Sequence, residues 1–399
     1  MGTVTGSVPE KTLRWPLTRL DLAGAFGYIG VLFPIAITLI TLNNMNPTAV
    51  FLAAGLTYIL AGSYFQVPIA VQPFKAVAAI ALAMSLSPSA IASAGLVMGL
   101  LLILVGVTNL ATRLAKLFSL PIVRGIQLGL GLLLAREGLR LVLGPRSGLE
   151  LGAGTSIAAW KIALGGAMIL LLLQGSRRFP AALALLVAGI VLGMLAHWNK
   201  LPSLGWGIVP IEILRPKIAE LRGVMALLVV PQFALTFGNS IVATENTAQL
   251  LYGPRSRRVT VRGLSLSIGL VNILAAFVQA APMCHGSGGI TAHYKFGART
   301  PKSSYVIGGA CILLALFGRG AVGLLHLIPT ALLGVFLIYV GIQHAAYLRD
   351  IVRRRSMVFI AVTVGVVSIA TTNLMWGFLV GFFLEAVFAG LARVRKEKP

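Results

Sequence analysis

Long apolar stretches, separated by short polar or basic segments, are the dominant pattern along the chain. Six of them are long enough, or nearly so, to cross a hydrocarbon core of roughly 30 Å. They cover residues 22–42, 93–114, 157–173, 183–197, 303–316 and 357–371. Counted together with the shorter, Gly- or Pro-broken segments between them, they predict an all-α polytopic membrane protein with roughly fourteen spans.

The composition also favours a lipid environment. Hydrophobic residues make up 57% of the 399 residues and charged residues only 11%, and the mean hydropathy is +0.92. Because the spans use most of the chain, no sizeable soluble domain is expected. The two cysteines, Cys284 and Cys311, lie inside apolar stretches and do not form a disulfide framework. The first apolar stretch is too long for a signal-peptide core, so it is interpreted as a retained span.

The basic excess, 33 Lys and Arg against 10 Asp and Glu, lies in the loops between spans. This arrangement is normal in membranes, so no nucleic-acid partner is expected. With the spans threaded alternately, most basic clusters fall on one side, which the positive-inside rule identifies as the cytoplasm. Both termini are expected on that side of the cell membrane. The residues that fall on the other side are Arg136, Arg140, Arg146, Arg215 and Arg319.

Two Pro-containing segments, residues 67–76 and 279–286, interrupt the apolar pattern in the same way about half the chain apart. A second pair, residues 24–30 and 231–240, repeats with a similar separation. Two halves of about seven spans each are implied. Because seven is odd, the second half must lie upside down relative to the first, which makes an inverted repeat.

Each broken segment predicts a short extended stretch that leads into a half-helix near the bilayer midplane, half-helices 3 and 10. The residue before proline avoids the helical region, whereas proline suits a first helical turn. Irregular backbone at that depth persists only where it lines a cavity. Two half-helix N-termini that face each other offer free N–H groups and partial positive charge, which predicts an anion site. Lys75 adds a full positive charge in the first turn of half-helix 3. Glycines in the first turn of half-helix 10 allow a ligand to approach the backbone closely.

The predicted substrate-binding residues lie in or beside these segments. They are Gln72, Phe74, Lys75, Gln232, Thr236, Asn239, Ser240, Cys284, His285, Gly286 and Ser287. For Gln72 and Gln232, hydrogen bonds to backbone groups freed by proline are an equal alternative, and Thr236, Asn239 and Ser240 equally suit bonds between helices. Glu245 is the candidate coupling residue, with a salt bridge to a buried base as the alternative.

Enzyme, metal and cofactor chemistry are not indicated. Cys284 and His285 are neighbours in sequence, so they do not face each other on a helix, and no third group orients them. No metal-ligand spacing, Walker loop or dinucleotide motif occurs, so neither a metal nor a cofactor is expected. Three other histidines, His197, His326 and His344, lie near predicted span ends, where an interfacial position is expected.

The broken segments resemble the molybdate transporter family, which is related to the sulfate permeases. The resemblance rests on residues 67–75, 281–289, 294–299 and 231–240 and covers most of the chain. It implies a seven-plus-seven inverted repeat like that of uracil and sulfate permeases. The core domain would comprise residues 1–118 (spans 1 to 4) and 222–320 (spans 8 to 11). The gate domain would comprise residues 119–221 (spans 5 to 7) and 321–399 (spans 12 to 14).

The same resemblance implies secondary-active transport of a tetrahedral oxyanion, molybdate ahead of sulfate, by alternating access. A transporter of sulfate or another anion, or an uncoupled anion channel, is the alternative. The expected partners are the oxyanion and the lipid bilayer, and a homodimer is left open. The chain departs from the family in its first span, where a usual Gly-Asp-Leu-Gly-Thr run is replaced by Gly27-Tyr28-Ile29-Gly30-Val31.

Overall fold

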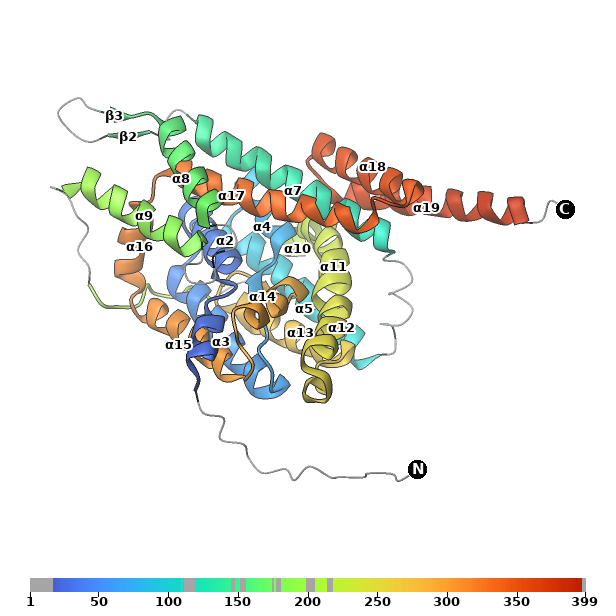
Figure 1. Cartoon of the computed structure of the whole chain (residues 1–399), viewed down its shortest axis with the longest axis horizontal. Helices are drawn as coiled ribbons and strands as arrows, with labels where there is room; N and C mark the ends of the chain where they lie inside the picture. The colour runs from blue at the N-terminus through green and yellow to red at the C-terminus, as the bar shows by residue number, and fades with distance from the viewer. Residues whose placement is uncertain are drawn as a thin grey trace, which may run out of the picture.

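Helices make up nearly all of the computed structural model, which describes residues 17–108, 110, 119–144, 148–150, 156–173, 176, 181–198, 205–213 and 218–396 (Figure 1). The helices of the first half are α1 (Arg19–Ala25), α2 (Ile29–Leu42), α3 (Pro47–Phe65), α4 (Lys75–Ala83), α5 (Pro88–Val107), α7 (Leu120–Leu143), α8 (Ala159–Leu173) and α9 (Ala181–Ala196). The second half begins with a long bent helix made of α10 (Ile218–Val224), η2 (Met225–Val229), α11 (Val230–Leu235), η3 (Thr236–Val242), α12 (Ala243–Tyr252) and η4 (Gly253–Ser256). It continues with α13 (Val261–Phe277), α14 (Ser287–Lys295), α15 (Lys302–Leu316), α16 (Gly318–His326), α17 (Thr330–Ala345), η5 (Ala346–Ile351), α18 (Arg355–Thr371) and α19 (Leu374–Lys396).

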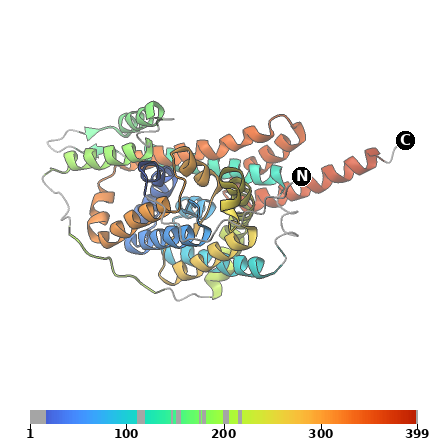
Figure 2. The same cartoon turned by 60° about the horizontal axis from the view of Figure 1, so that its bottom comes forward.

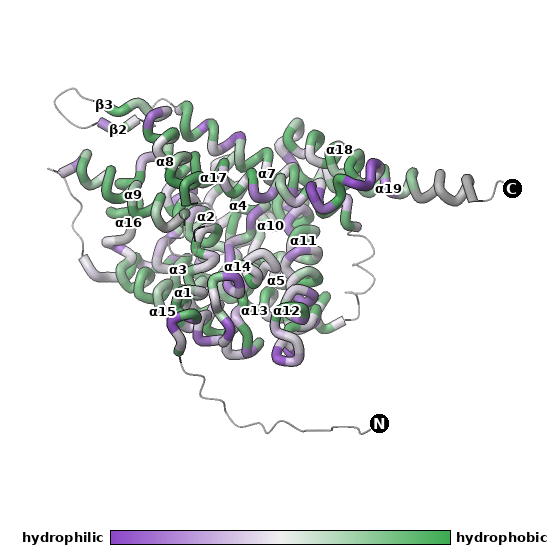
Figure 3. The backbone as a smooth tube through the Cα atoms, viewed as in Figure 1, coloured by the Kyte–Doolittle hydropathy of each residue, from purple (hydrophilic) through white to green (hydrophobic). Residues whose placement is uncertain are grey.

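Five helical segments within the described residues are long and apolar enough to cross a membrane. They are Arg19–Leu42, Pro47–Phe65, Pro88–Val107, Leu221–Ser256 and Thr330–Ile351. Shorter apolar helices include α8, α13 and α18, and hydrophobic residues dominate α8 and α9 in Figure 3. The protein is therefore a multi-pass integral membrane protein. Each of the six predicted apolar stretches overlaps one of these helices, whereas the count of fourteen spans stays a prediction.

Helices from one half of the chain pack along helices from the other half. The main pairs are α3 with α15, α5 with α13, and α7 with α17. In Figures 1 and 2 the C-terminal helices α17 to α19 lie along the upper side, above the blue helices of the first half.

Glycines make these pairs close. A Cβ added to Gly55 of α3 would lie 2.7 Å from the carbonyl oxygen of Gly308 in α15, and one on Gly308 would lie 2.8 Å from that of Gly55. The same reciprocal contact joins α5 to α13 and, twice, α7 to α17. The further pairs are Gly99 with Gly269, Gly131 with Gly341, and Gly138 with Gly334. Small residues let helix backbones approach closely where no hydrophobic effect drives them together.

The two interrupted segments meet as a pair of short antiparallel strands. In β1 (Gln72–Pro73) and β4 (Met283–Cys284), Gln72 lies opposite Cys284 and Pro73 opposite Met283. The extended stretches predicted ahead of the two half-helices are thus confirmed. The prolines are not in the first helical turns, because the Phe74 amide donates to the Pro282 carbonyl (2.8 Å) and keeps the backbone extended past Pro73. A second strand pair joins β2 (Leu149–Glu150) to β3 (Ser156–Ile157).

Candidate functional site

A cavity of about 330 Å³ lies where α4 and α14 begin. Its walls include Tyr28 ahead of α2, Lys75 of α4, Gly288 of α14, Tyr339 and His344 of α17, and Tyr347 of η5. Two other lining residues are adjacent to basic positions in the sequence: Phe296 follows Lys295, and Ser176 precedes Arg177, which lies outside the described residues. Basic positions thus border part of the cavity lining along the sequence.

Lys75 is the first residue of α4, and only 8% of its surface is exposed. Its ammonium donates to the hydroxyl of Tyr28 at 3.3 Å, and that hydroxyl donates to Oε1 of Gln72. Tyr28 reaches this position because the first span is interrupted: α1 ends at Ala25 and α2 begins at Ile29. Tyr28 lies in the run where the resemblance leads one to expect an aspartate, and in this chain the contact to the buried lysine comes from a neutral phenol.

Gln72 connects the two strands. Its amide nitrogen donates to the carbonyl of His285 at 3.2 Å and lies 3.6 Å from the sulfur of Cys284. A Cβ at Gly286 would lie 2.6 Å from this nitrogen, so only glycine allows the approach. Gly286 therefore contacts protein atoms in this structure. In α14 it is Gly288 that lines the cavity, and the sequence analysis did not place it among the predicted site residues.

The side chain of Gln232 caps α4 from the other half of the chain. Its Oε1 accepts from the amides of Ala76 (2.9 Å) and Val77 (3.3 Å), and its nitrogen donates to the hydroxyl of Thr236 at 2.9 Å. The first-turn amides of α4 that were expected to be free are thus partly satisfied within the protein. In α14 the amides of Ser287 and Gly288 begin the helix, with no earlier turn to accept from them.

His285 is buried, and both of its ring nitrogens have protein partners. Nδ1 lies 3.0 Å from the carbonyl oxygen of Ala70 and Nε2 lies 3.1 Å from the hydroxyl of Ser267. Ser287 donates to Oδ1 of Asn239 at 3.0 Å. These bonds hold the start of α14 against α13 and η3.

The predicted substrate-binding residues therefore gather at one place in the fold, but only some of them line a cavity. Lys75 lines the larger cavity, and Asn239 lines a second one of about 250 Å³ beside Arg124. Eight others are buried around the two helix starts: Gln72, Phe74, Gln232, Thr236, Ser240, Cys284, His285 and Gly286. Their contact with a substrate stays a prediction.

Glu245 lies in α12, partly exposed, and its Oε1 accepts from the amide of Val261 at 3.3 Å. Within the described part of the chain the ion pairs are Arg124–Asp350, Arg136–Glu137 and Arg140–Glu137, so Glu245 forms no salt bridge there. Glu245 is also absent from the described lining of both cavities. Its coupling role stays a prediction.

His344 is buried, with 4% of its surface exposed, and lies one residue before the end of α17. Its interfacial position stays a prediction. His197 and His326 are exposed.

Asp21 is a second residue that the sequence analysis missed. It is 1% exposed, and its Oδ1 accepts from the amides of Arg299 and Thr300, both at 3.0 Å. The hydroxyl of Thr18 donates to Oδ2 at 2.8 Å. A buried acid in an apolar run was the available signal, since such residues are rare in membranes. The amides of Arg299 and Thr300 thus tie α1 to the segment between α14 and α15.

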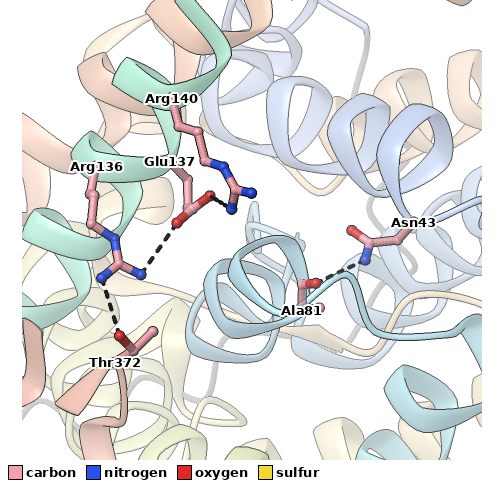
Figure 4. A network of polar contacts seen from close by, with 6 residues as sticks. All are labelled: Asn43, Ala81, Arg136, Glu137, Arg140 and Thr372. Atoms are coloured by element: carbon pink, nitrogen blue, oxygen red, sulfur yellow. Dashed lines mark hydrogen bonds and ion pairs between the residues drawn. The ribbon is translucent and has the colours of Figure 1, made fainter. Parts of the chain in front are cut away.

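A separate polar network lies on α7. Glu137 lies between Arg136, whose guanidinium is 3.3 Å away, and Arg140, at 3.7 Å, and Arg136 also donates to the hydroxyl of Thr372 (Figure 4). Across the view, Asn43 donates to the carbonyls of Ala81 and Leu86, both at 2.9 Å. Asn43 thus fastens the end of α4 that lies away from Lys75.

Three proteins of known name are similar to this chain along most of its length. Molybdate transporter 2 of Arabidopsis thaliana is 29% identical over 410 residues, covering 93% of this chain and 87% of the relative. Molybdate transporter 1 of Arabidopsis thaliana is 26% identical, covering 92% and 87%. Molybdate transporter 1 of Chlamydomonas reinhardtii is 29% identical, covering 94% and 92%.

The fold is similar to that of solved anion transporters. The transmembrane domain of a cyanobacterium bicarbonate transporter, BicA, has a TM-score of 0.65 at 16% identity. The match covers 91% of this chain and 96% of the BicA domain. Murine SLC26A9, an anion transporter in the inward-facing state, has a TM-score of 0.66 at 16% identity, covering 96% of this chain and 70% of SLC26A9. At this identity the likeness establishes the fold alone.

The family model described as "Molybdate transporter of MFS superfamily" matches residues 21–134 and 224–343. These two matches cover more than half of the chain, and they include Tyr28, Lys75, Gly288 and Tyr339 of the cavity wall, whereas His344 and Tyr347 lie beyond them. The curated relatives and the solved folds are all transporters by name. This chain therefore belongs to the molybdate transporter family and is an anion transporter.

Proposed function

We propose that this protein is a secondary-active transporter of a tetrahedral oxyanion, molybdate ahead of sulfate. The observation that carries the proposal is Lys75, a buried cation at the first residue of a half-helix, facing a cavity that also receives the first turn of α14. A fixed positive charge beside a helix N-terminus favours an anion.

The oxyanion would bind between Lys75 and the first turn of α14. Lys75 would supply a charge-assisted hydrogen bond, and the amides of Ser287 and Gly288 would supply neutral donors. Since a Cβ at Gly288 would meet only the Tyr347 hydroxyl, at 3.0 Å, the space beside this turn is otherwise open. Gln72, Gln232 and the residues that they contact would hold the two helix starts in register.

The seven-plus-seven inverted repeat is supported by the reciprocal glycine pairs. If the halves are equivalent, the α3–α15 and α5–α13 pairs are symmetry mates, and the α7–α17 pair lies on the symmetry axis. The core would be residues 1–118 and 222–320, and the gate residues 119–221 and 321–399. Lys75 and Gly288 would then face the cavity from the core, and His344 and Tyr347 from the gate.

Movement of core against gate would expose the site to each side in turn. Because basic positions border two of the lining residues in the sequence, under the positive-inside rule the cavity would open to the cytoplasm, with both termini on that side of the cell membrane.

The test is uptake of labelled molybdate into proteoliposomes, with sulfate as competitor. Lys75→Gln removes the charge but keeps a donor, and we expect affinity to fall roughly 10- to 100-fold, since a hydrogen bond to a charged group contributes about 1.5–3 kcal/mol. Lys161→Gln is the matched control, because Lys161 is exposed on α8 and lies over the ring of Trp160.

Two outcomes would overturn the proposal. One is a well-folded Lys75→Gln protein that binds both oxyanions like wild type. The other is a protein that binds bicarbonate or a neutral uracil-like compound but binds neither molybdate nor sulfate. Flux that never accumulates substrate against a gradient would identify the alternative, an uncoupled channel.

A further inference from the structure

His344 is a buried histidine with an unsatisfied ring atom at the wall of the cavity. Only 4% of the residue is exposed, and Nδ1 has no hydrogen-bond partner among the described residues. The buried His285 differs from it, because both ring nitrogens of His285 have protein partners. Leaving a buried polar group unpaired costs about 1–3 kcal/mol. Nδ1 itself is covered by protein atoms, but His344 lines the cavity, so a partner bound there can approach its imidazole.

The charges around the cavity favour an anion as that partner. Among the described residues that line it, the charged side chain is Lys75 of α4, and no carboxylate is present. The other titratable groups in the wall are the phenols of Tyr28, Tyr339 and Tyr347. The guanidinium of Arg124, from α7, lies 5.2 Å from the centre of the Tyr347 ring. A dianion bound here would thus meet one full positive charge from Lys75, which leaves one negative charge uncompensated.

We propose that His344 takes up one proton when the oxyanion binds and donates an N–H to it from α17, opposite Lys75. This proposal rests on the proposed function, because it requires an oxyanion in this cavity. The proton comes from the aqueous phase that fills the cavity and is held on the imidazole, which becomes imidazolium. No bond within the oxyanion is made or broken, and the proton returns to water when the anion leaves. The two cations, Lys75 and protonated His344, together balance the two charges of the anion.

This arrangement couples binding to pH without a carboxylate in the cavity. Histidine is the side chain whose ordinary protonation range lies closest to neutral pH, and a nearby anion favours its charged form. If one proton accompanies each anion, affinity above that range falls by up to about tenfold for each unit of pH. The driving force for uptake would then include the proton gradient.

The experiment is a sulfate binding titration on purified, detergent-solubilised full-length protein at about pH 6.5 and about pH 8.5, which lie at and well above the ordinary pKa of histidine. Proton uptake on binding is measured in the same samples in weak buffer with an indicator dye. For wild type we expect weaker binding at the higher pH and close to one proton taken up per sulfate. For His344→Gln we expect affinity that changes little with pH and no proton uptake. The control is His326→Gln, which alters an exposed histidine of α16.

Three results decide the matter. Proton uptake that persists in His344→Gln assigns the proton to another group, such as Lys75, and overturns the proposal. Absence of proton uptake in wild type overturns it without any variant, so a His344→Gln protein that fails to fold does not prevent the test. If wild type binds neither sulfate nor molybdate, the proposed function fails as well. If oxyanion binding weakens in Lys75→Gln but no proton is taken up on binding, the proposed function is supported and the role of His344 is overturned.

Discussion

The contact between Gly308 in α15 and Gly55 in α3 predicts a position-specific effect of one added methyl group. In Gly308→Ala the new Cβ would lie 2.8 Å from the carbonyl oxygen of Gly55 and 2.7 Å from Cγ1 of Ile59. The isoleucine can rotate, but the carbonyl belongs to the helix backbone. The two helices must therefore move apart by roughly half an ångström before the contact reaches an ordinary van der Waals distance.

Overpacking of this kind costs about 1–3 kcal/mol, and the replacement of a helical glycine by alanine recovers about 0.8–1 kcal/mol. The neighbouring Gly309 separates the overpacking cost from the gain in helix propensity. A Cβ there meets nothing within 4 Å, so Gly309→Ala has the gain without the cost. Gly309→Ala should leave the free energy of unfolding unchanged or raise it slightly. Gly308→Ala should be about 1–3 kcal/mol less stable than Gly309→Ala. We would measure both by titrating detergent-solubilised protein with a denaturing detergent, and equal stability of the two variants would refute the close helix contact.

Three further substitutions test other contacts. Tyr28→Asp places a carboxylate beside Lys75, so we expect an internal ion pair to compete with the anion and weaken binding by more than about tenfold in a sulfate titration; unchanged affinity would contradict the contact. Asp21→Asn removes a charged acceptor from two buried amides and should lower the free energy of unfolding by about 1–3 kcal/mol in a detergent melt. Glu245→Gln should keep gradient-driven accumulation in proteoliposomes if His344 carries the proton; loss of accumulation with intact binding would support coupling through Glu245.

The broken segments and Lys75 could be recognised in the sequence because their signals are local. Prolines within apolar runs mark where helices stop, and a lysine in the next turn is conspicuous among alanines. The capping of α4 by Gln232 could not be foreseen, since 156 residues separate Gln232 from Ala76. The burial of His344 could not be foreseen for a related reason. It depends on which other helices pack against α17, and a hydropathy pattern does not describe that packing.

The β1–β4 pair has a consequence for biosynthesis. Gln72 and Cys284 are separated by 212 residues, and ribosomes add about 5–20 residues each second, so Gln72 waits roughly 10–40 s for its partner. During that time the segment around Lys75 would be an unpaired polar strand with a charge in an apolar surrounding, at a cost of several kcal/mol. We therefore expect the insertion machinery or a chaperone to hold the nascent first half until the second half emerges. A chain truncated before β4 should be retained there or degraded.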